Sequence, residues 1–270
     1  NGNAGGIAGS NESGAQIINA SVNNGVKIGV AKCDAASIAA NNFGTIQGGT
    51  VGSCDITFAG ESIGAVTAIN NAGTISGVTL SGSATIAFHG PATNVGGIAG
   101  KNAGTIGNCN VNSPALALNG LTARADSISL GGAAGVNMQG ATISETTVTL
   151  NITDNLNKYK NLGGVAGENA GDGTLFECTY QGALGQANTA ANDNITTGAA
   201  NVLDTVGGIV GLNNGKVDGC SVPKITLQVM GASGLSDSQT YAEKLKNRKF
   251  SLDEETLRPY FELSRVKAGV

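Results

Sequence analysis

The chain has very few of the residues that build an ordinary globular core or a catalytic site. Its 270 residues include no Trp, six Phe, four Tyr and a single His, and only 13% are charged. Ten aromatic residues are too few for a bulky hydrophobic core. The stability of the fold therefore has to come from a regular arrangement of small residues. One His excludes a zinc site of the two-His kind and any pair of histidine catalysts.

The charge pattern also excludes several classes of partner. The formal net charge is −4, and Lys and Arg are sparse over residues 1–235, which leaves no positive surface for nucleic acid or an anionic membrane. No run approaches the roughly 20 apolar residues that a membrane-spanning helix needs. There is neither an initiating Met nor a signal peptide, so we expect a piece of a longer protein.

What the chain has in excess is Gly, with 43 residues, and much of it lies in a repeat. A Gly-rich apolar pentad is followed by Asn and then by a β-branched or aliphatic residue, most clearly in Val95–Asn102 (VGGIAGKN) and Val206–Asn213 (VGGIVGLN). Looser copies place their Asn at Asn11, Asn41, Asn70, Asn137 and Asn169. Successive Asn residues are 29 (Asn41 to Asn70) to 44 (Asn169 to Asn213) positions apart, a period typical of stacked solenoid units.

Short segments with alternating apolar residues, such as Thr146–Ile152 and Ser83–Phe88, read as strands. The pattern therefore predicts an all-β fold, a right-handed parallel β-solenoid of about seven coils over residues 1–235. Equivalent aliphatic residues should stack into two buried ladders. One would contain Ile7, Ile38, Val66, Ile98, Val165 and Ile209, and the other Ile17, Ile46, Ile75, Ile106, Ile143, Leu175 and Val217.

The polar and glycine positions of the repeat predict its corners. Asn tolerates the left-handed backbone region, and its amide can pair with the Asn of the next coil, so we expect the recurrent Asn at a corner. The Gly-Gly pair should lie where two backbones approach closely.

The five Cys residues match no zinc spacing and are odd in number. Cys109, Cys178 and Cys220 each lie three residues after a ladder aliphatic, where other copies carry Ala20, Val78 and Thr146. We favour the interpretation that these three Cys residues fill a position for a small buried side chain, because free Cys behaves as a small hydrophobic residue. A disulfide or a reactive thiol is the alternative.

The Gly-(Leu/Ile/Val)-x-Gly core of these repeats resembles the GLUG motif. The likeness covers roughly residues 4–222. It is strong at 95–111, 162–178 and 206–222, and weak at 35–51, 63–80 and 130–148. The resemblance implies a secreted or wall-attached bacterial repeat array that acts as a stalk or adhesin. GLUG repeats are also found in the non-catalytic regions of IgA-specific metallopeptidases. The GLUG motif implies a repeat architecture, and it implies neither a chemical activity nor a cofactor.

Residues 236–270 have a different composition, with seven Lys or Arg, four aromatic residues and one Gly. We expect an amphipathic helix over Asp237–Phe250 and a second one that opens at Ser251, with Glu254 as its capping partner. Tyr241–Leu263 resembles a segment of the peptidyl-dipeptidase and thimet-oligopeptidase zinc peptidases, whose His-Glu-x-x-His motif is absent here. The tail is either a helical cap or a join between unrelated coding segments.

Few residues could carry chemistry. His89, which we place at the end of a strand, reads as a surface residue rather than the base of a Ser-His-Asp triad. Asp172 near Glu177, and Asp193 between two Asn residues, read as solvated loop carboxylates rather than calcium ligands. We therefore predict no catalytic, cofactor-binding or metal-binding residue.

These observations favour a non-enzymatic structural or adhesive module of a bacterial cell-surface or secreted protein. Its partners would be a host or matrix protein or glycan, together with other domains of the parent chain. One alternative is the accessory stalk of a secreted, IgA-protease-like peptidase. Another is ice binding by a flat Thr face, for which Thr147 and Thr149 form a single Thr-x-Thr that does not recur in each coil.

Overall fold

A computed structural model describes residues 3–29, 33–58, 60–82, 84–112, 115–123, 128–152, 159–182, 195–196, 205–222 and 229–230. Contacts divide the chain into Asn1–Met230 and Gly231–Val270, and every described residue belongs to the first unit. All its described regular structure is β-strand. The helical tail predicted over residues 236–270 lies outside the described residues.

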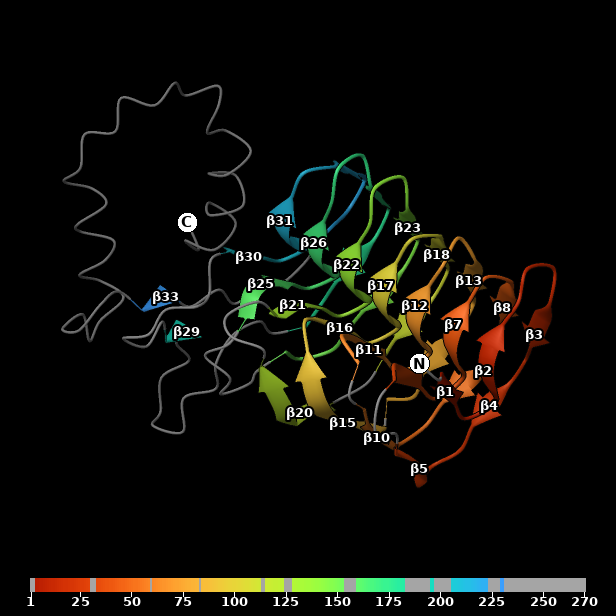
Figure 1. The fold of residues 1–270 in the computed structure, drawn as a ribbon. Coiled ribbons are helices and arrows are strands. Elements are labelled where there is room, and N and C mark those ends of the chain that lie inside the picture. Colours follow the sequence, from red (N-terminus) through yellow and green to blue (C-terminus); the bar gives the residue numbers. More distant parts are fainter. Residues whose placement is uncertain are drawn as a thin grey trace, which may run out of the picture. The chain divides into compact units, whose positions relative to one another are not determined.

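Five of the six parallel sheets take their strands from successive coils (Figure 1). Sheet 1 has seven strands: β1 (Ala4–Gly5), β6 (Ala35–Ala36), β11 (Ser62–Gly64), β16 (Asn94–Gly96), β21 (Ile128–Gly131), β25 (Tyr159–Gly163) and β30 (Thr205–Gly207). Sheet 2 has seven: β2 (Ala8–Asn11), β7 (Ala39–Asn42), β12 (Thr67–Asn70), β17 (Ala99–Asn102), β22 (Ala134–Asn137), β26 (Ala166–Asn169) and β31 (Val210–Asn213).

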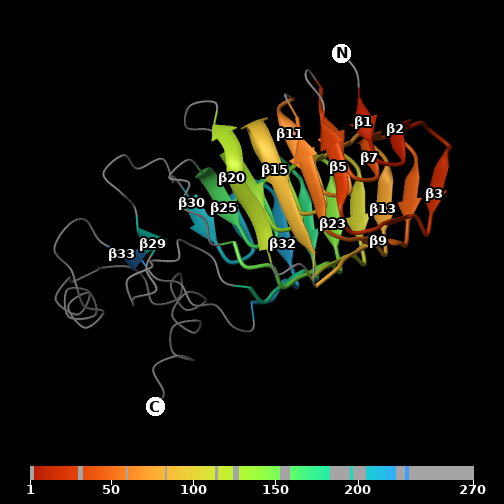
Figure 2. The same cartoon turned by 90° about the horizontal axis from the view of Figure 1, so that it is seen from below.

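Sheet 3 also has seven strands: β3 (Gln16–Ile18), β8 (Thr45–Gln47), β13 (Thr74–Ser76), β18 (Thr105–Gly107), β23 (Thr142–Ser144), β27 (Thr174–Phe176) and β32 (Lys216–Asp218). Sheet 4 has six: β4 (Ser21–Val22), β9 (Thr50–Val51), β14 (Thr79–Leu80), β19 (Asn110–Val111), β24 (Thr147–Val148) and β28 (Thr179–Tyr180). Sheet 5 has four: β5 (Val26–Gly29), β10 (Cys54–Thr57), β15 (Thr85–Ala92) and β20 (Ala115–Ala123), with the longer β15 and β20 side by side (Figure 2). β29 (Ile195–Thr196) pairs with β33 (Val229–Met230). The all-β parallel solenoid is thus confirmed.

The ladder predicted through sheet 3 is confirmed in full register. Ile46 pairs with Ile17 and Ile75, Ile106 pairs with Ile75 and Ile143, and Leu175 pairs with Ile143 and Val217. The five inner members are completely buried. Ile17 is only partly buried and Val217 is 39% exposed, so the predicted burial of these two end members was wrong. Each lies in a terminal strand of sheet 3, with no described strand on its outer side.

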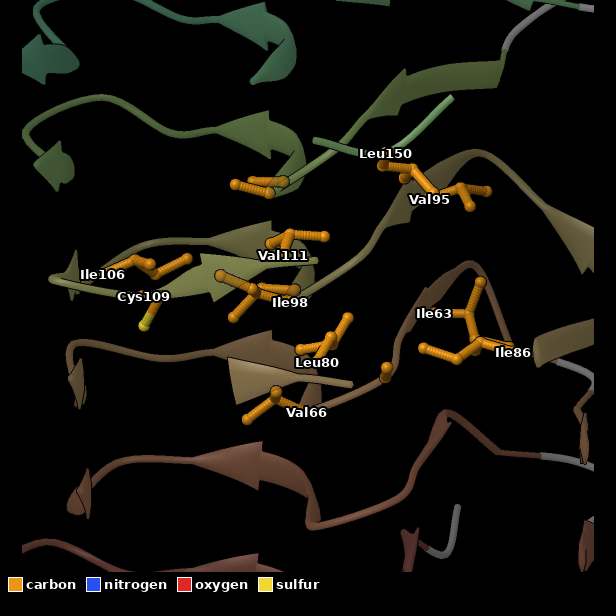
Figure 3. Packing of buried hydrophobic residues seen from close by; sticks show 14 of the residues in the cluster. Ile63, Val66, Leu80, Ile86, Val95, Ile98, Ile106, Cys109, Val111 and Leu150 are labelled. Atoms are coloured by element: carbon orange, nitrogen blue, oxygen red, sulfur yellow. The ribbon is translucent and has the colours of Figure 1, made fainter. Parts of the chain in front are cut away.

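The second predicted ladder is confirmed in its inner members and is corrected at three positions. Ile38, Val66, Ile98 and Val165 are completely buried, and Figure 3 shows Val66 and Ile98 among the packed aliphatic side chains. Ala133 takes the place that the prediction left empty, since the Ile98 N–H donates to the Ala133 carbonyl and the Ala133 N–H to that of Val165. Ile7 and Ile209 occupy the two terminal coils. Ile7 is 46% exposed, and Ile209 is partly buried.

The recurrent Asn residues form a continuous amide ladder inside the solenoid, as predicted. Each side chain donates from Nδ2 to Oδ1 of the Asn in the next coil, at 2.7–2.9 Å. Its members are Asn11, Asn42, Asn70, Asn102, Asn137, Asn169 and Asn213. Asn42 replaces the predicted Asn41, which lies on the outer face of the same strand.

The left-handed conformation predicted for these Asn residues was wrong. They end strands of sheet 2 with ordinary backbone. Positive φ occurs instead in some of the turns that follow them, at Gly14, Ala72, Gly140 and Gly171, and regularly at the corner between sheets 3 and 4. One residue of each coil takes φ between 48° and 65° there: Asn19, Gly48, Gly77, Asn108, Glu145, Glu177 and Gly219.

The Gly-Gly pairs lie where backbones approach closely, as predicted. A Cβ on Gly97 would overlap the carbonyl oxygen of Gly132 in the next coil. A Cβ on Gly164 would overlap both the Gly208 carbonyl and the Tyr180 ring. These positions admit only Gly because the main chain of the adjacent coil fills the space.

Candidate functional site

The outer face of sheet 3 has a column of Thr residues that crosses five successive coils. Each Thr directly precedes an aliphatic residue of the buried ladder, so strand alternation directs its side chain to the outside. The members pair in register and are half-buried or exposed. We name this set the threonine column: Thr45, Thr74, Thr105, Thr142 and Thr174. Gln16 and Lys216 occupy the same position in the flanking strands.

A second outward column of hydroxyls runs along sheet 4. Its members are Ser21, Thr50, Thr79, Thr147, Thr179 and Ser221, with Asn110 in the middle. The hydroxyls of Ser21 and Thr50, and those of Thr179 and Ser221, are 3.1 Å apart and hydrogen-bonded. Side chains in both columns repeat at the strand spacing of about 4.8 Å, which gives the surface a regular array of hydroxyl and methyl groups.

The sequence interpretation missed this repetition. A flat Thr face was expected from Thr-x-Thr within one strand, which Thr147 and Thr149 alone provide. Thr147 belongs to the sheet 4 column, but the hydroxyl of Thr149 is hydrogen-bonded to Oδ1 of Asn112 at 3.0 Å. The useful signal was a Thr before the ladder aliphatic in five consecutive coils.

His89 lies on the outer face of sheet 5, beside a carboxylate. Its Nε2 is 3.1 Å from Oδ1 of Asp55, and both side chains are 43% exposed. β15 continues past His89 to Ala92, so its predicted place at the end of a strand was wrong. No serine hydroxyl contacts His89 within the described residues, and the pair therefore lacks the nucleophile of a triad.

The loop carboxylates do not converge. Oδ1 of Asp172 accepts a hydrogen bond from the Gly140 N–H of the neighbouring coil at 2.8 Å, which stabilises a loop. Glu177 is exposed at the left-handed corner, and Asp193 lies outside the described residues. Within the described part of the chain, no three His, Cys, Asp or Glu side chains are grouped as metal ligands.

Cys109, Cys178 and Cys220 occupy the small-residue slot that the repeat predicts. Cys109 and Cys178 are buried, as are Val78 and Thr146 at the equivalent position, and Cys220 is half-buried. All five Cys residues are free thiols. Burial raises the pKa of Cys109 to about 11. The adjacent Cys178 side chain lowers the pKa of Cys220 below its usual range, and so does the Cys178 main-chain N–H, which donates to Cys220 Sγ at 3.4 Å. The interaction with Cys220 and burial raise the pKa of Cys178.

We expect Cys220 to be alkylated by iodoacetamide at lower pH than an ordinary thiol, because the thiolate reacts and the Cys178 thiol stabilises it. Its rate should rise with pH as the thiolate forms, while Cys109 and Cys178 react only after unfolding. Peptide mass spectrometry over a pH series measures each site. Cys178→Ala should move the Cys220 profile to higher pH, and an unchanged profile would contradict the assigned role of the Cys178 side chain.

Within the described residues, no helix is long and apolar enough to cross a membrane. Comparison of the chain with family models, curated proteins and solved structures gives no match.

Proposed function

We propose that this chain is a non-enzymatic structural or adhesive module of a bacterial cell-surface or secreted protein. The observation that carries the proposal is the continuous outer surface formed by the threonine column and the sheet 4 hydroxyls. A ligand on this surface would contact the same side chain in coil after coil, so many weak contacts would add up. The resemblance to GLUG repeats supports the extracellular setting.

The polar residues support binding rather than catalysis. His89 and Asp55 form an exposed pair without a nucleophile, and the buried polar side chains of the Asn ladder bond to one another between the coils. Such an arrangement stabilises the solenoid but offers no group to activate a substrate. Peptide or glycan hydrolysis that persists through purification and is lost in His89→Ala would contradict this part of the proposal.

A solid-phase binding assay tests the adhesive surface. The full chain is applied to immobilised matrix proteins and glycans, and the double variant Thr105→Lys/Thr142→Lys should lose most of the binding. Thr57→Lys/Thr85→Lys is the matched control, because it adds the same charge on exposed Thr residues of sheet 5. The adhesive proposal fails if no probe binds, or if both double variants bind equally well.

Ice binding is a second candidate, now favoured by the threonine column itself. Five in-register Thr residues present hydroxyl and methyl groups at about the 4.8 Å strand spacing, and a regular array of this kind suits a crystalline surface. Inhibition of ice recrystallisation by the full chain, reduced by Thr105→Lys/Thr142→Lys and retained by Thr57→Lys/Thr85→Lys, would support it. Ice growth unaffected by the chain would exclude it.

A further inference from the structure

Two Cys residues occupy the same small-residue slot in neighbouring coils. Cys178 follows β27, and Cys220 follows the equivalent strand β32 of the next coil. Cys109, the third Cys of the slot, is separated from Cys178 by the coil that carries Thr146. Cys178 is a buried free thiol and Cys220 a half-buried one. The hydroxyl surface proposed above for binding does not use this pair.

The main chain holds the two Cys residues about one strand spacing apart. The Ser221 N–H donates to the Cys178 carbonyl at 2.8 Å, and the Cys178 N–H donates to Cys220 Sγ at 3.4 Å. Thr179 and Ser221, the next residues in each coil, form a parallel bridge. The strand spacing of about 4.8 Å lies within the Cα–Cα range of roughly 4.4–6.8 Å that a disulfide needs. Closing the bond also requires the Cβ atoms to come within roughly 3.5–4.5 Å, a small approach for two corner residues that lie outside the strands.

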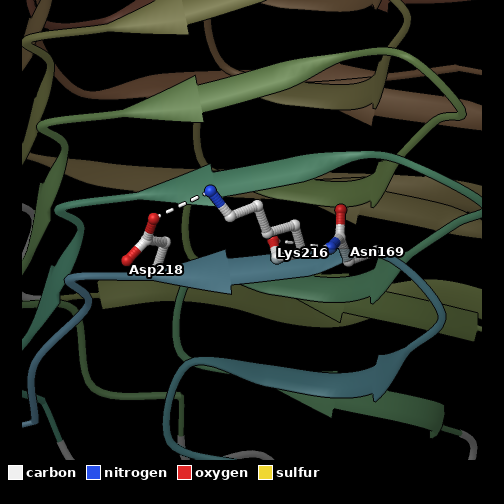
Figure 4. Close-up of polar contacts among 3 residues, drawn as sticks. All are labelled: Asn169, Lys216 and Asp218. Carbon is white, nitrogen blue, oxygen red and sulfur yellow. Dashed lines mark hydrogen bonds and ion pairs between the residues drawn. The ribbon is translucent and has the colours of Figure 1, made fainter.

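The surroundings of the pair favour a thiolate on Cys220. The Cys178 side chain and the Cys178 N–H lower the pKa of Cys220. The negative charge of Asp218 opposes the thiolate, but Lys216 Nζ lies 2.8 Å from Asp218 Oδ2 and offsets that charge (Figure 4). Cys220 is therefore the nucleophile of the pair. Cys178, whose pKa is raised by its contact with Cys220 and by burial, is the partner thiol.

The pair also lies at the junction between coils that has the longest connection. Asn169 and Asn213 of the amide ladder are 44 residues apart, whereas the other successive members are 28–35 residues apart. Holding two segments together costs more entropy as the chain between them lengthens. Contacts such as the 3.3 Å hydrogen bond from Asn169 Nδ2 to the Lys216 carbonyl join these two coils. A covalent bond between them would add most where chain connectivity helps least.

We propose that Cys178 and Cys220 form a disulfide between coils when the chain meets a low-molecular-weight disulfide, and that this bond fastens the coil of β32 to the coil of β27. The Cys220 thiolate attacks one sulfur of the oxidant, whose S–S bond breaks and releases a thiolate. Cys178 then loses its proton to solvent and attacks Cys220 Sγ, which releases the second thiolate. Two protein thiols are oxidised, and one small disulfide is reduced to two thiols.

Oxidised glutathione at mildly alkaline pH tests the bond on the folded full chain. The mass should fall by about 2 Da, the two thiol hydrogens, and a digest should contain a peptide pair linked through Cys178 and Cys220. Cys178→Ser should instead retain glutathione on Cys220, because it lacks the thiol that displaces it. Thr146 in the same slot shows that a hydroxyl fits there. Cys109→Ser is the matched control and should form the bond as the unsubstituted chain does.

Trypsin cleavage after Lys216 measures whether the bond fastens the coil. Lys216 is in β32, and a protease reaches this strand only when the coil opens locally. Oxidation should slow this cleavage about tenfold or more, and dithiothreitol should restore the original rate. Cleavage after Lys101, in β17, should change little.

Four results would overturn the proposal. The folded chain could stay reduced, carry only mixed disulfides, or form links only between molecules or only in urea. The fourth is a chain with the Cys178–Cys220 bond that trypsin cleaves after Lys216 at the unchanged rate. Circular dichroism before oxidation shows that the strands are present in each variant.

Discussion

Replacement of Ile98 by Asp is expected to cost on the order of 4 kcal/mol of folding free energy or more. Ile98 is completely buried, and its main chain is bonded to Val66 in one neighbouring coil and Ala133 in the other. A carboxylate there would be removed from solvent and surrounded, among the described residues, by the apolar side chains of the core. Because each coil of a solenoid is stabilised by its neighbours, a defect in the middle weakens both sides of the stack.

Urea denaturation followed by the β-strand circular dichroism signal measures this loss. Ile98→Val should cost only about 1 kcal/mol, since it removes one methylene from the ladder. Lys101→Asp is the second control, because Lys101 lies on the same turn of chain but faces outward from β17. An Ile98→Asp variant as stable as Lys101→Asp would show that the apolar ladder does not hold the coils together.

The repeat period made most of this fold predictable. When equivalent residues return after one coil, backbone pairing puts them in register, as the sheet 3 ladder from Ile17 to Val217 shows. The prediction failed where it relied on side-chain size. Ala133 was overlooked because it is smaller than Ile98 or Val165, yet the main chain holds it in the same place. The backbone register decides which residue of a coil belongs to the ladder. Its side chain only has to be small enough for the space between the neighbouring coils.

The left-handed corner could not be located from residue types. Asn is suited both to positive φ and to amide ladders, and this chain uses it for each purpose in different places. Asn108 is left-handed, whereas Asn102 is in the ladder. At the left-handed corner two coils carry Glu145 and Glu177, a residue type that does not indicate positive φ. Only the three-dimensional register separates the two uses.

The candidate surface was missed for a related reason. Strands of sheet 3 are three residues long, too short for alternation within one strand to be informative. Thr74 and Thr105 become part of a pattern only when the coils are stacked. A property that repeats along the solenoid axis is best sought by comparing equivalent positions of different coils.

The second large effect is expected for Asn42→Ala, at about 3 kcal/mol of lost stability. Asn42 is completely buried. Its Oδ1 accepts from Asn11 Nδ2 at 2.7 Å, and its Nδ2 donates to Asn70 Oδ1 at 2.8 Å. The substitution deletes both bonds and leaves Asn70 Oδ1 without its donor from the adjacent coil. A buried acceptor that loses its donor carries the full cost of its desolvation.

The adjacent residue provides a matched control with the same chemical change. Asn41 faces outward from β7, and its Oδ1 accepts one bond of 3.2 Å from Asn71 Nδ2. Asn41→Ala should therefore cost no more than about 0.5 kcal/mol, as is usual at a solvated surface. Urea denaturation of the two variants side by side gives the difference. Equal losses would mean that the amide ladder adds nothing beyond an exposed hydrogen bond, and a greater loss in Asn41→Ala would restore Asn41 as the ladder residue.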